Sequence, residues 1–211
     1  MLFRVFATAA IAGAAFAASV ALKAPAPLSA AAPVAMVAFI LDPAHTMVQF
    51  KVRHLGISTV TGRFATFTGA FQLDPATGQA ADAQLSIDAA SINTDNDRRN
   101  ADLRSPNFFN ADTFPKITFA STSIQKTSGN KYTMNGNLTM HGVTKPVTLD
   151  VELSGTRQTA RGWIAALSMT GSIKRKEFGL TWDRMTEGVA VVSDDVTLLI
   201  DVEAKTAPPA P

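Results

Sequence analysis

The sequence predicts an all-β fold: an eight-stranded antiparallel barrel with one short helical insertion between the third and fourth strands. From Thr46 onward apolar and polar side chains alternate with a period of two, the pattern of strands with one buried and one solvated face. The alternating segments follow one another mostly through short turns, and closing eight such strands into a barrel removes the exposed sheet edges. A two-sheet sandwich satisfies the same alternation and is the alternative fold.

Three strands are predicted before the insertion. The first starts at Thr46 and places Val48, Phe50 and Val52 on one face. The second spans about 60–73, where two internal glycines indicate bends, and the third spans about 81–91. The sequence Asp-Pro-Ala-Thr-Gly at 74–78 predicts a tight turn between them, because proline presets φ and glycine accepts a left-handed conformation.

The insertion is residues 93–122, which hold the one helix that the folded region predicts. Thr94 or Asp95 is expected to cap the start of the helix, since a short side-chain oxygen can accept the free amide protons of the first turn. The helix should end near Arg104, because Pro106 disfavours the helical conformation at the residue before it. Three large apolar rings follow in a stretch without strand alternation: Phe108, Phe109 and Phe114.

Five strands are predicted after the helix, at about 117–127, 132–140, 147–154, 161–173 and 194–204. The last of them alternates clearly, with Val196, Leu198, Ile200 and Val202 on one face. No internal repeat is visible. The alternation therefore continues through the rest of the domain, which supports a single all-β unit.

The N-terminal segment is predicted to lie outside the fold. Arg4 precedes a continuous run of small and apolar residues, and Ala15-Phe16-Ala17 fits a cleavage pattern, so residues 1–24 are expected to be a signal peptide. An uncleaved membrane anchor is the alternative, because about 18 apolar residues can just span a bilayer. Residues 25–40 are then an Ala/Pro-rich spacer, 41–205 the barrel domain, and 206–211 a disordered tail.

Composition excludes several classes of function. The chain has no cysteine, which rules out disulfides, thiolate metal sites and cysteine nucleophiles. The formal net charge of +2 is too small for a nucleic-acid-binding footprint, so no nucleic acid partner is expected. A signal peptide on a chain without cysteine points to the periplasm, with no stable membrane span after cleavage.

The barrel interior is the candidate site. An eight-stranded barrel is just wide enough to be filled by its own side chains or to hold one small ligand. The three phenylalanines of the insertion have only the barrel mouth to cover, because the strand exteriors are polar. The loop at 174–182 also mixes bulky apolar residues with charge, and an apolar pocket with such a rim is typical of a lipophile site.

Catalysis has little support in the sequence. His45, His54 and His141 are scattered, without the spacing that would place two metal ligands on one helix face. Each histidine is expected to be a hydrogen-bonded turn or rim residue. We therefore predict no catalytic residues, no metal and no cofactor, and we do not expect an enzyme.

The sequence resembles the YceI-like, polyisoprenoid-binding family over about Leu41 to Ala204. The resemblance rests on short motifs that occur in a fixed order, each of them weak alone: Asp42-Pro43-Ala44-His45-Thr46, Gly62-Arg63-Phe64, residues 99–105 with Phe108-Phe109, 114–119, 136–147, and Phe178-Gly179-Leu180. The resemblance implies a lipocalin-like barrel, usually secreted, that holds an isoprenoid or another amphiphile in its bore. The usual helix of the family reads Arg-Asp-x-His-Leu, whereas Asn100 and Asp102 stand at its Asp and His here.

The resulting prediction is a periplasmic carrier for a long-chain isoprenoid or similar amphiphilic lipid, with that lipid as its partner and a homodimer also considered. The cavity wall is expected to contain Phe50, Leu85, Phe119, Leu138, Met140, Leu149, Trp163, Met169 and Leu198. The mouth is expected to contain Phe108, Phe109, Phe114, Phe178 and Trp182, and the head-group candidates are Arg99, Asp102 and His54. The alternatives are an enzyme that acts on a lipid head group through a histidine, and a barrel with a solid core that serves structure or interaction.

Overall fold

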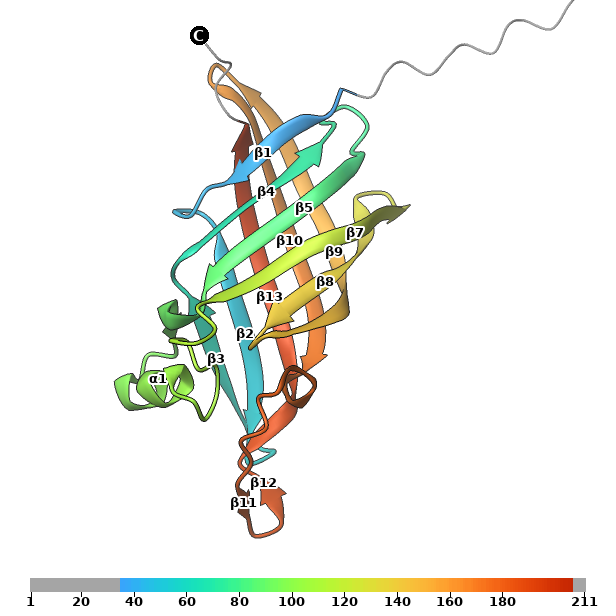
Figure 1. Ribbon diagram of the computed structural model, residues 1–211. Coiled ribbons are helices and arrows are strands. Elements are labelled where there is room, and N and C mark those ends of the chain that lie inside the picture. The colour runs from blue at the N-terminus through green and yellow to red at the C-terminus, as the bar shows by residue number, and fades with distance from the viewer. Residues whose placement is uncertain (1–34, 207–211) are drawn as a thin grey trace, which may run out of the picture. The chain divides into compact units, whose positions relative to one another are not determined.

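A computed structural model describes residues 35–206, and Figure 1 shows a barrel of long strands with one helix beside its end. The predicted signal peptide and residues 207–211 of the predicted tail lie outside the described residues. The strands are β1 (Val37–Leu41), β2 (Met47–His54), β3 (Ser58–Phe64), β4 (Phe67–Leu73), β5 (Ala80–Asp88), β6 (Ile92–Asn93), β7 (Lys116–Ser128), β8 (Lys131–Met140), β9 (Val143–Thr159), β10 (Gly162–Lys174), β11 (Met185–Thr186), β12 (Val189–Ala190) and β13 (Val192–Thr206). The helices are α1 (Asp97–Arg104) and the short 3₁₀ turns η1 (Ala89–Ser91) and η2 (Arg175–Phe178).

Eight antiparallel strands close the barrel. Their order is β1-β4-β5-β7-β8-β9-β10-β13, and the pairing of β1 with β13 completes the ring. Over the N-terminal part of β13, its neighbour is β2 instead of β1, and β3 and β6 continue the sheet beyond β2. This confirms the predicted barrel and excludes the two-sheet sandwich.

Several predicted strand boundaries are wrong. The predicted second strand is two strands, because residues Ala65 and Thr66 interrupt it. β3 pairs with β2, whereas β4 pairs with β1 and β5. The predicted third strand ends at Asp88, whose side chain accepts a hydrogen bond from the Ala90 amide and begins η1. The hairpin β11–β12 was not predicted.

The barrel also begins earlier than the sequence suggested. β1 starts at Val37, inside the segment assigned to the spacer, and β13 runs through Thr206. Phe39 of β1 is fully buried and stacks on Phe71 of β4, with ring centroids 5.4 Å apart and planes 6° apart. β1 therefore belongs to the barrel, and it closes the ring by pairing with both β4 and β13.

The helix lies between β6 and β7 and is capped differently from the prediction. Asn96, not Thr94 or Asp95, is the N-cap, and its side chain accepts a hydrogen bond from the Arg99 amide. Asp95 is instead in a left-handed conformation (φ 55°) and pairs with Arg63 of β3. The helix ends at Arg104, as the proline at 106 predicted. Among residues 35–206 no helix is long and apolar enough to cross a membrane.

Candidate functional site

A cavity of about 390 Å³ runs through the barrel interior. This volume falls within the range of roughly 300–1,000 Å³ that is usual for small-molecule sites. The sequence-predicted wall residues that line it are Phe50, Leu85, Phe119, Leu138, Met140, Leu149, Met169 and Leu198. The alternation along the strands therefore placed these side chains on the inner face.

The rings of two wall phenylalanines lie against glycines of neighbouring strands. A Cβ atom at Gly62 would lie 2.3 Å from Cζ of Phe50, and one at Gly136 would lie 2.3 Å from Cζ of Phe119. Only a glycine lets a ring approach the backbone so closely. The two rings consequently lie along the wall, which leaves the centre of the barrel open.

Trp163 is a correction, because it does not line the cavity. Its backbone amide donates a hydrogen bond to Thr206 Oγ1 at the end of β13, so it lies near the end of the barrel. The fully buried Phe39, Ala165 and Ala204 fill this end. Alternation indicated the correct face of β10 but not the distance of Trp163 along the barrel.

At the opposite end, the insertion covers the cavity with aromatic rings. Phe108, Phe109 and Trp182 all line the cavity. The ring of Phe108 lies 5.1 Å from that of Trp182, and the ring of Phe109 meets that of Phe64 edge-on at 5.8 Å. Such pairs add stability beyond the area they bury. Aromatic residues from three separate segments thus form this end of the site.

Two predicted mouth residues lie elsewhere. Phe114 does not line the cavity: its ring packs against His141 in the β8–β9 turn, with centroids 4.6 Å apart. Phe178 is only 1% exposed and belongs to the core beneath η2, not to the cavity surface. Both are large rings outside the predicted strands, and the sequence cannot distinguish a ring that covers a cavity from one that anchors its own segment.

The three head-group candidates all lie on the cavity lining at the helix end. Arg99 is held by Thr94: its Nε donates to Thr94 Oγ1 at 2.8 Å and its Nη2 donates to the Thr94 carbonyl at 2.7 Å. Asp102 accepts a hydrogen bond from Asn107 Nδ2 at 3.1 Å and is exposed. His54 is the last residue of β2. Polar and charged side chains therefore gather at the end that carries α1.

Asn100, one of the two departures from the family pattern, has a clear structural role. It is 5% exposed, and its Oδ1 accepts hydrogen bonds from both the backbone amide and the hydroxyl of Thr94, at 2.8 and 2.7 Å. An aspartate could accept the same two bonds, so the amide replaces it without loss of the contact. Asn100 thereby fastens α1 to the chain that leaves β6.

Arg175 also lines the cavity, although it was not predicted from the sequence. It is 4% exposed, and four of its five N–H donors bond to backbone carbonyls, those of Leu180, Trp182, Val192 and Ser193. Burial lowers the pKa of its guanidinium from the ordinary value. Arg175 makes no direct ion pair with a carboxylate among the described residues. Its guanidinium therefore adds positive charge to the cavity surface. The mixed composition of residues 174–182 was the available signal.

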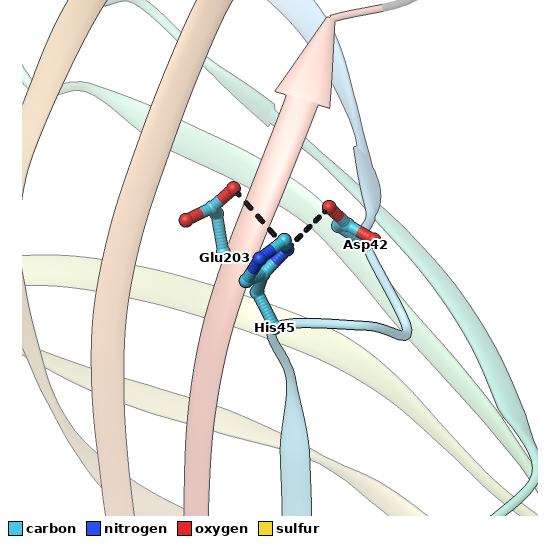
Figure 2. Close-up of side chains that lie close together, drawn as sticks. All are labelled: Asp42, His45 and Glu203. Atoms are coloured by element: carbon cyan, nitrogen blue, oxygen red, sulfur yellow. Dashed lines mark hydrogen bonds and ion pairs between the residues drawn. The ribbon is translucent and has the colours of Figure 1, made fainter.

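The histidines are not brought together. Figure 2 shows His45 between Asp42, on the turn after β1, and Glu203 on β13, with Nδ1 2.8 Å from Asp42 Oδ2 and 3.7 Å from Glu203 Oε1. Each of the three residues could offer a ligand atom to a metal ion, within 4.8 Å of one another. The Lys205 ammonium already contacts both carboxylates, so these groups form an ion-pair cluster that connects the β1–β2 turn to β13.

The other two histidines lie elsewhere. His54 is at the opposite end of β2 from His45, and His141 lies in the β8–β9 turn.

Comparison with known proteins places the whole barrel in one family. The YceI-like domain model matches residues 39–204. The protein YceI of Salmonella arizonae is 38% identical over 160 residues, which cover 75% of this chain and 81% of the relative.

Solved structures agree with the fold. The crystal structure of the Campylobacter jejuni YCEI protein superposes with a TM-score of 0.65 at 37% identity, covering 78% of this chain and 95% of that one. A polyisoprenoid binding domain from Saccharophagus degradans, implicated in plant cell wall breakdown, superposes with a TM-score of 0.56 at 20% identity, covering 81% of this chain and 99% of that one. At that identity the second likeness concerns the fold alone.

Proposed function

This chain belongs to the YceI-like family, and on that premise we propose that it is a binding protein that holds a long-chain isoprenoid or a similar amphiphilic lipid inside its barrel. The observation that carries the proposal is the cavity of about 390 Å³, whose wall is built almost entirely of apolar side chains. A cavity of this kind suits an apolar chain, because each buried methylene contributes about 0.8 kcal/mol to transfer out of water. Part of that gain is offset by the ordering of the chain.

The ligand is expected to bind in one direction. Arg99, Asp102 and His54 line the cavity at the helix end, and Arg175 adds a buried positive charge to the lining. The opposite end is lined by buried apolar residues such as Phe71, Leu73 and Val202. A polar head group therefore belongs at the helix end, with the apolar chain extending away from it. The Saccharophagus degradans polyisoprenoid binding domain, which has the same fold, makes an isoprenoid the first ligand to test.

The proposal involves binding without covalent chemistry. An enzyme acting on a head group would need an acid, base or nucleophile within reach of the reacting atoms. His45 and His141 lie outside the cavity lining, which leaves His54 as the histidine on the cavity surface. We also propose a periplasmic location, which rests on the predicted signal peptide in residues 1–24.

The proposal is tested by extracting protein that has been purified without detergent from its native host and identifying the released molecules by mass spectrometry. We expect a long-chain lipid in an amount comparable to that of the protein. Denatured and washed protein serves as the control for lipid that adheres nonspecifically. Finding no long-chain species above that control would contradict the proposal.

A further inference from the structure

The main cavity adjoins a second pocket, with which it shares part of its lining. This outer pocket has a volume of about 260 Å³ and is lined by residues 77–80, Ile124, Lys126 and Tyr132. Three of its residues, Ala80, Ile124 and Tyr132, also line the main cavity. These three side chains thus form the partition between the two spaces, and Tyr132 is the largest of them.

Tyr132 is locked in place by the β4–β5 turn. It is 6% exposed, and its hydroxyl donates a hydrogen bond to the Gly78 carbonyl at 2.8 Å. A Cβ atom at Gly78 would lie 2.5 Å from that hydroxyl, and Gly78 has a φ of +73°, so glycine is required there on two grounds. Lys126 lies over the outer side, with Nζ 5.8 Å from the ring centroid and bonded to the Thr77 carbonyl at 3.3 Å.

The turn that holds Tyr132 is itself rigid. Asp74 is 4% exposed, and its carboxylate accepts hydrogen bonds from the Ala76 amide and the Thr77 hydroxyl, both at 2.9 Å. The Ala76 amide is the main cause that lowers the pKa of Asp74. Backbone bonds from Asp74 N to Gln79 O and from Gly78 N to Asp74 O, both 2.8 Å, close the turn. The ring of Tyr132 therefore stands against a fixed support.

We propose that Tyr132 sets the maximum length of the apolar chain that the barrel accepts. The inference rests on the proposed lipid-binding function and adds the residue that determines chain-length specificity. With the head group at the helix end, the chain extends toward Tyr132, and each additional buried methylene can raise affinity by at most about fourfold. Once the chain end meets the ring, further carbons have no cavity to enter. Removing the ring would join the outer pocket to the main cavity.

The test compares the wild type with Tyr132→Ala and Tyr132→Phe in binding to linear prenyl alcohols of increasing length. For the wild type, affinity should rise with length and then level off or fall. Tyr132→Ala should move that limit to longer chains by at least one isoprene unit. Tyr132→Phe keeps the ring but not its hydroxyl, so its limit should match that of the wild type. Tyr132→Leu, which retains more core volume, replaces the alanine variant if that variant does not fold.

The outcomes separate this inference from the function on which it rests. If the folded variants bind prenyl alcohols with the wild-type length limit, Tyr132 does not determine chain length, although the carrier proposal survives. If Tyr132→Phe shifts the limit as much as Tyr132→Ala, the hydroxyl and not the ring is responsible, which also overturns the inference. If the wild type binds no prenyl alcohol, both proposals fail.

Discussion

Asp42, on the turn between β1 and β2, is the residue whose ionisation matters most for the contact of this turn with β13. The hydrogen bond from the Lys205 ammonium is the main cause that lowers the pKa of the Asp42 carboxyl, and the contact with His45 adds to it. The pKa of Lys205 is raised in turn, chiefly by Asp42. Since the folded pKa of Asp42 lies below its ordinary value of 3.8, folding favours the ionised carboxyl. The contribution of this contact to stability is present above pH 3.8 and is lost as pH falls below that value.

We therefore expect Asp42→Asn to lower the urea midpoint relative to the wild type at pH 7, because the charge that holds Lys205 is gone. The difference should shrink as pH falls below 3.8, because the Asp42 carboxyl of the unfolded wild type then binds a proton while the folded carboxyl stays ionised. Urea unfolding at pH 7 and near pH 2.5 measures both differences. Asp201→Asn is the matched control, since this exposed carboxylate of β13 has no ion pair among the described residues. An Asp42→Asn deficit of equal size at both pH values would contradict this account.

The sequence predicts on which face of a strand a residue lies, but not its position along the barrel axis. Met169 and Leu198 both line the cavity, because a period of two determines which face of a strand is buried. The same pattern could not show that Trp163 lies near the closed end. Tyr132 shares the inner face of β8 with Leu138 and Met140, so its position was readable, but its contact with Gly78, 54 residues away in the chain, was not.

At the scale of elements, α1 is attached mainly by polar contacts, with Leu103 as the residue that packs against the apolar core. Asn100 is its only buried residue. Isolated helices of eight residues are marginal in water, so the position of α1 depends on its contacts with the barrel. Arg104 supplies two of them, donating to the carbonyls of Ala90 and Ile92 at 2.7 and 3.0 Å. Asn100 supplies two buried hydrogen bonds, which its side chain accepts from the amide and hydroxyl of Thr94.

Asn100→Ala should therefore loosen α1, because it leaves the buried Thr94 amide without its acceptor. A lost buried acceptor typically costs about 1–3 kcal/mol. Hydrogen exchange of the amides of residues 97–104 measures the local effect, and urea unfolding measures the global one. Asn100→Asp keeps an acceptor oxygen in place and should retain most of the wild-type protection. Equal protection in Asn100→Ala and the wild type would show that Asn100 does not hold the helix.

The strand that the sequence missed has a physical explanation. In β1, Phe39 points inward, while Ala38 and Ile40 are exposed even though both are apolar, with Ile40 52% exposed. The usual alternation is therefore hidden, and the strand follows directly after an Ala/Pro-rich segment of similar composition. The break between β3 and β4 was missed because it depends on a change of pairing partner, which is a tertiary property.

At the scale of the whole barrel, the sequence predicted closure but could not decide whether the interior is hollow. The same apolar residues could fill the barrel or line a cavity, because eight strands allow both. The outcome depends on where the rings lie. Phe50 and Phe119 lie against Gly62 and Gly136 on the wall, and this cross-strand contact leaves the cavity of about 390 Å³ open.

The central claim is that a lipid occupies this interior, and it is tested most directly by titrating three proteins with one apolar fluorescent probe. Met169 lines the cavity, so Met169→Trp places a larger ring in the space that the ligand would occupy. Trp163 does not line it, so Trp163→Leu is the matched control. Far-ultraviolet circular dichroism verifies that each variant is folded. We expect Met169→Trp to weaken probe binding by at least about tenfold, equivalent to 1.4 kcal/mol, and Trp163→Leu to bind as the wild type does. Unchanged binding in a folded Met169→Trp variant would contradict the claim that the ligand lies inside the barrel.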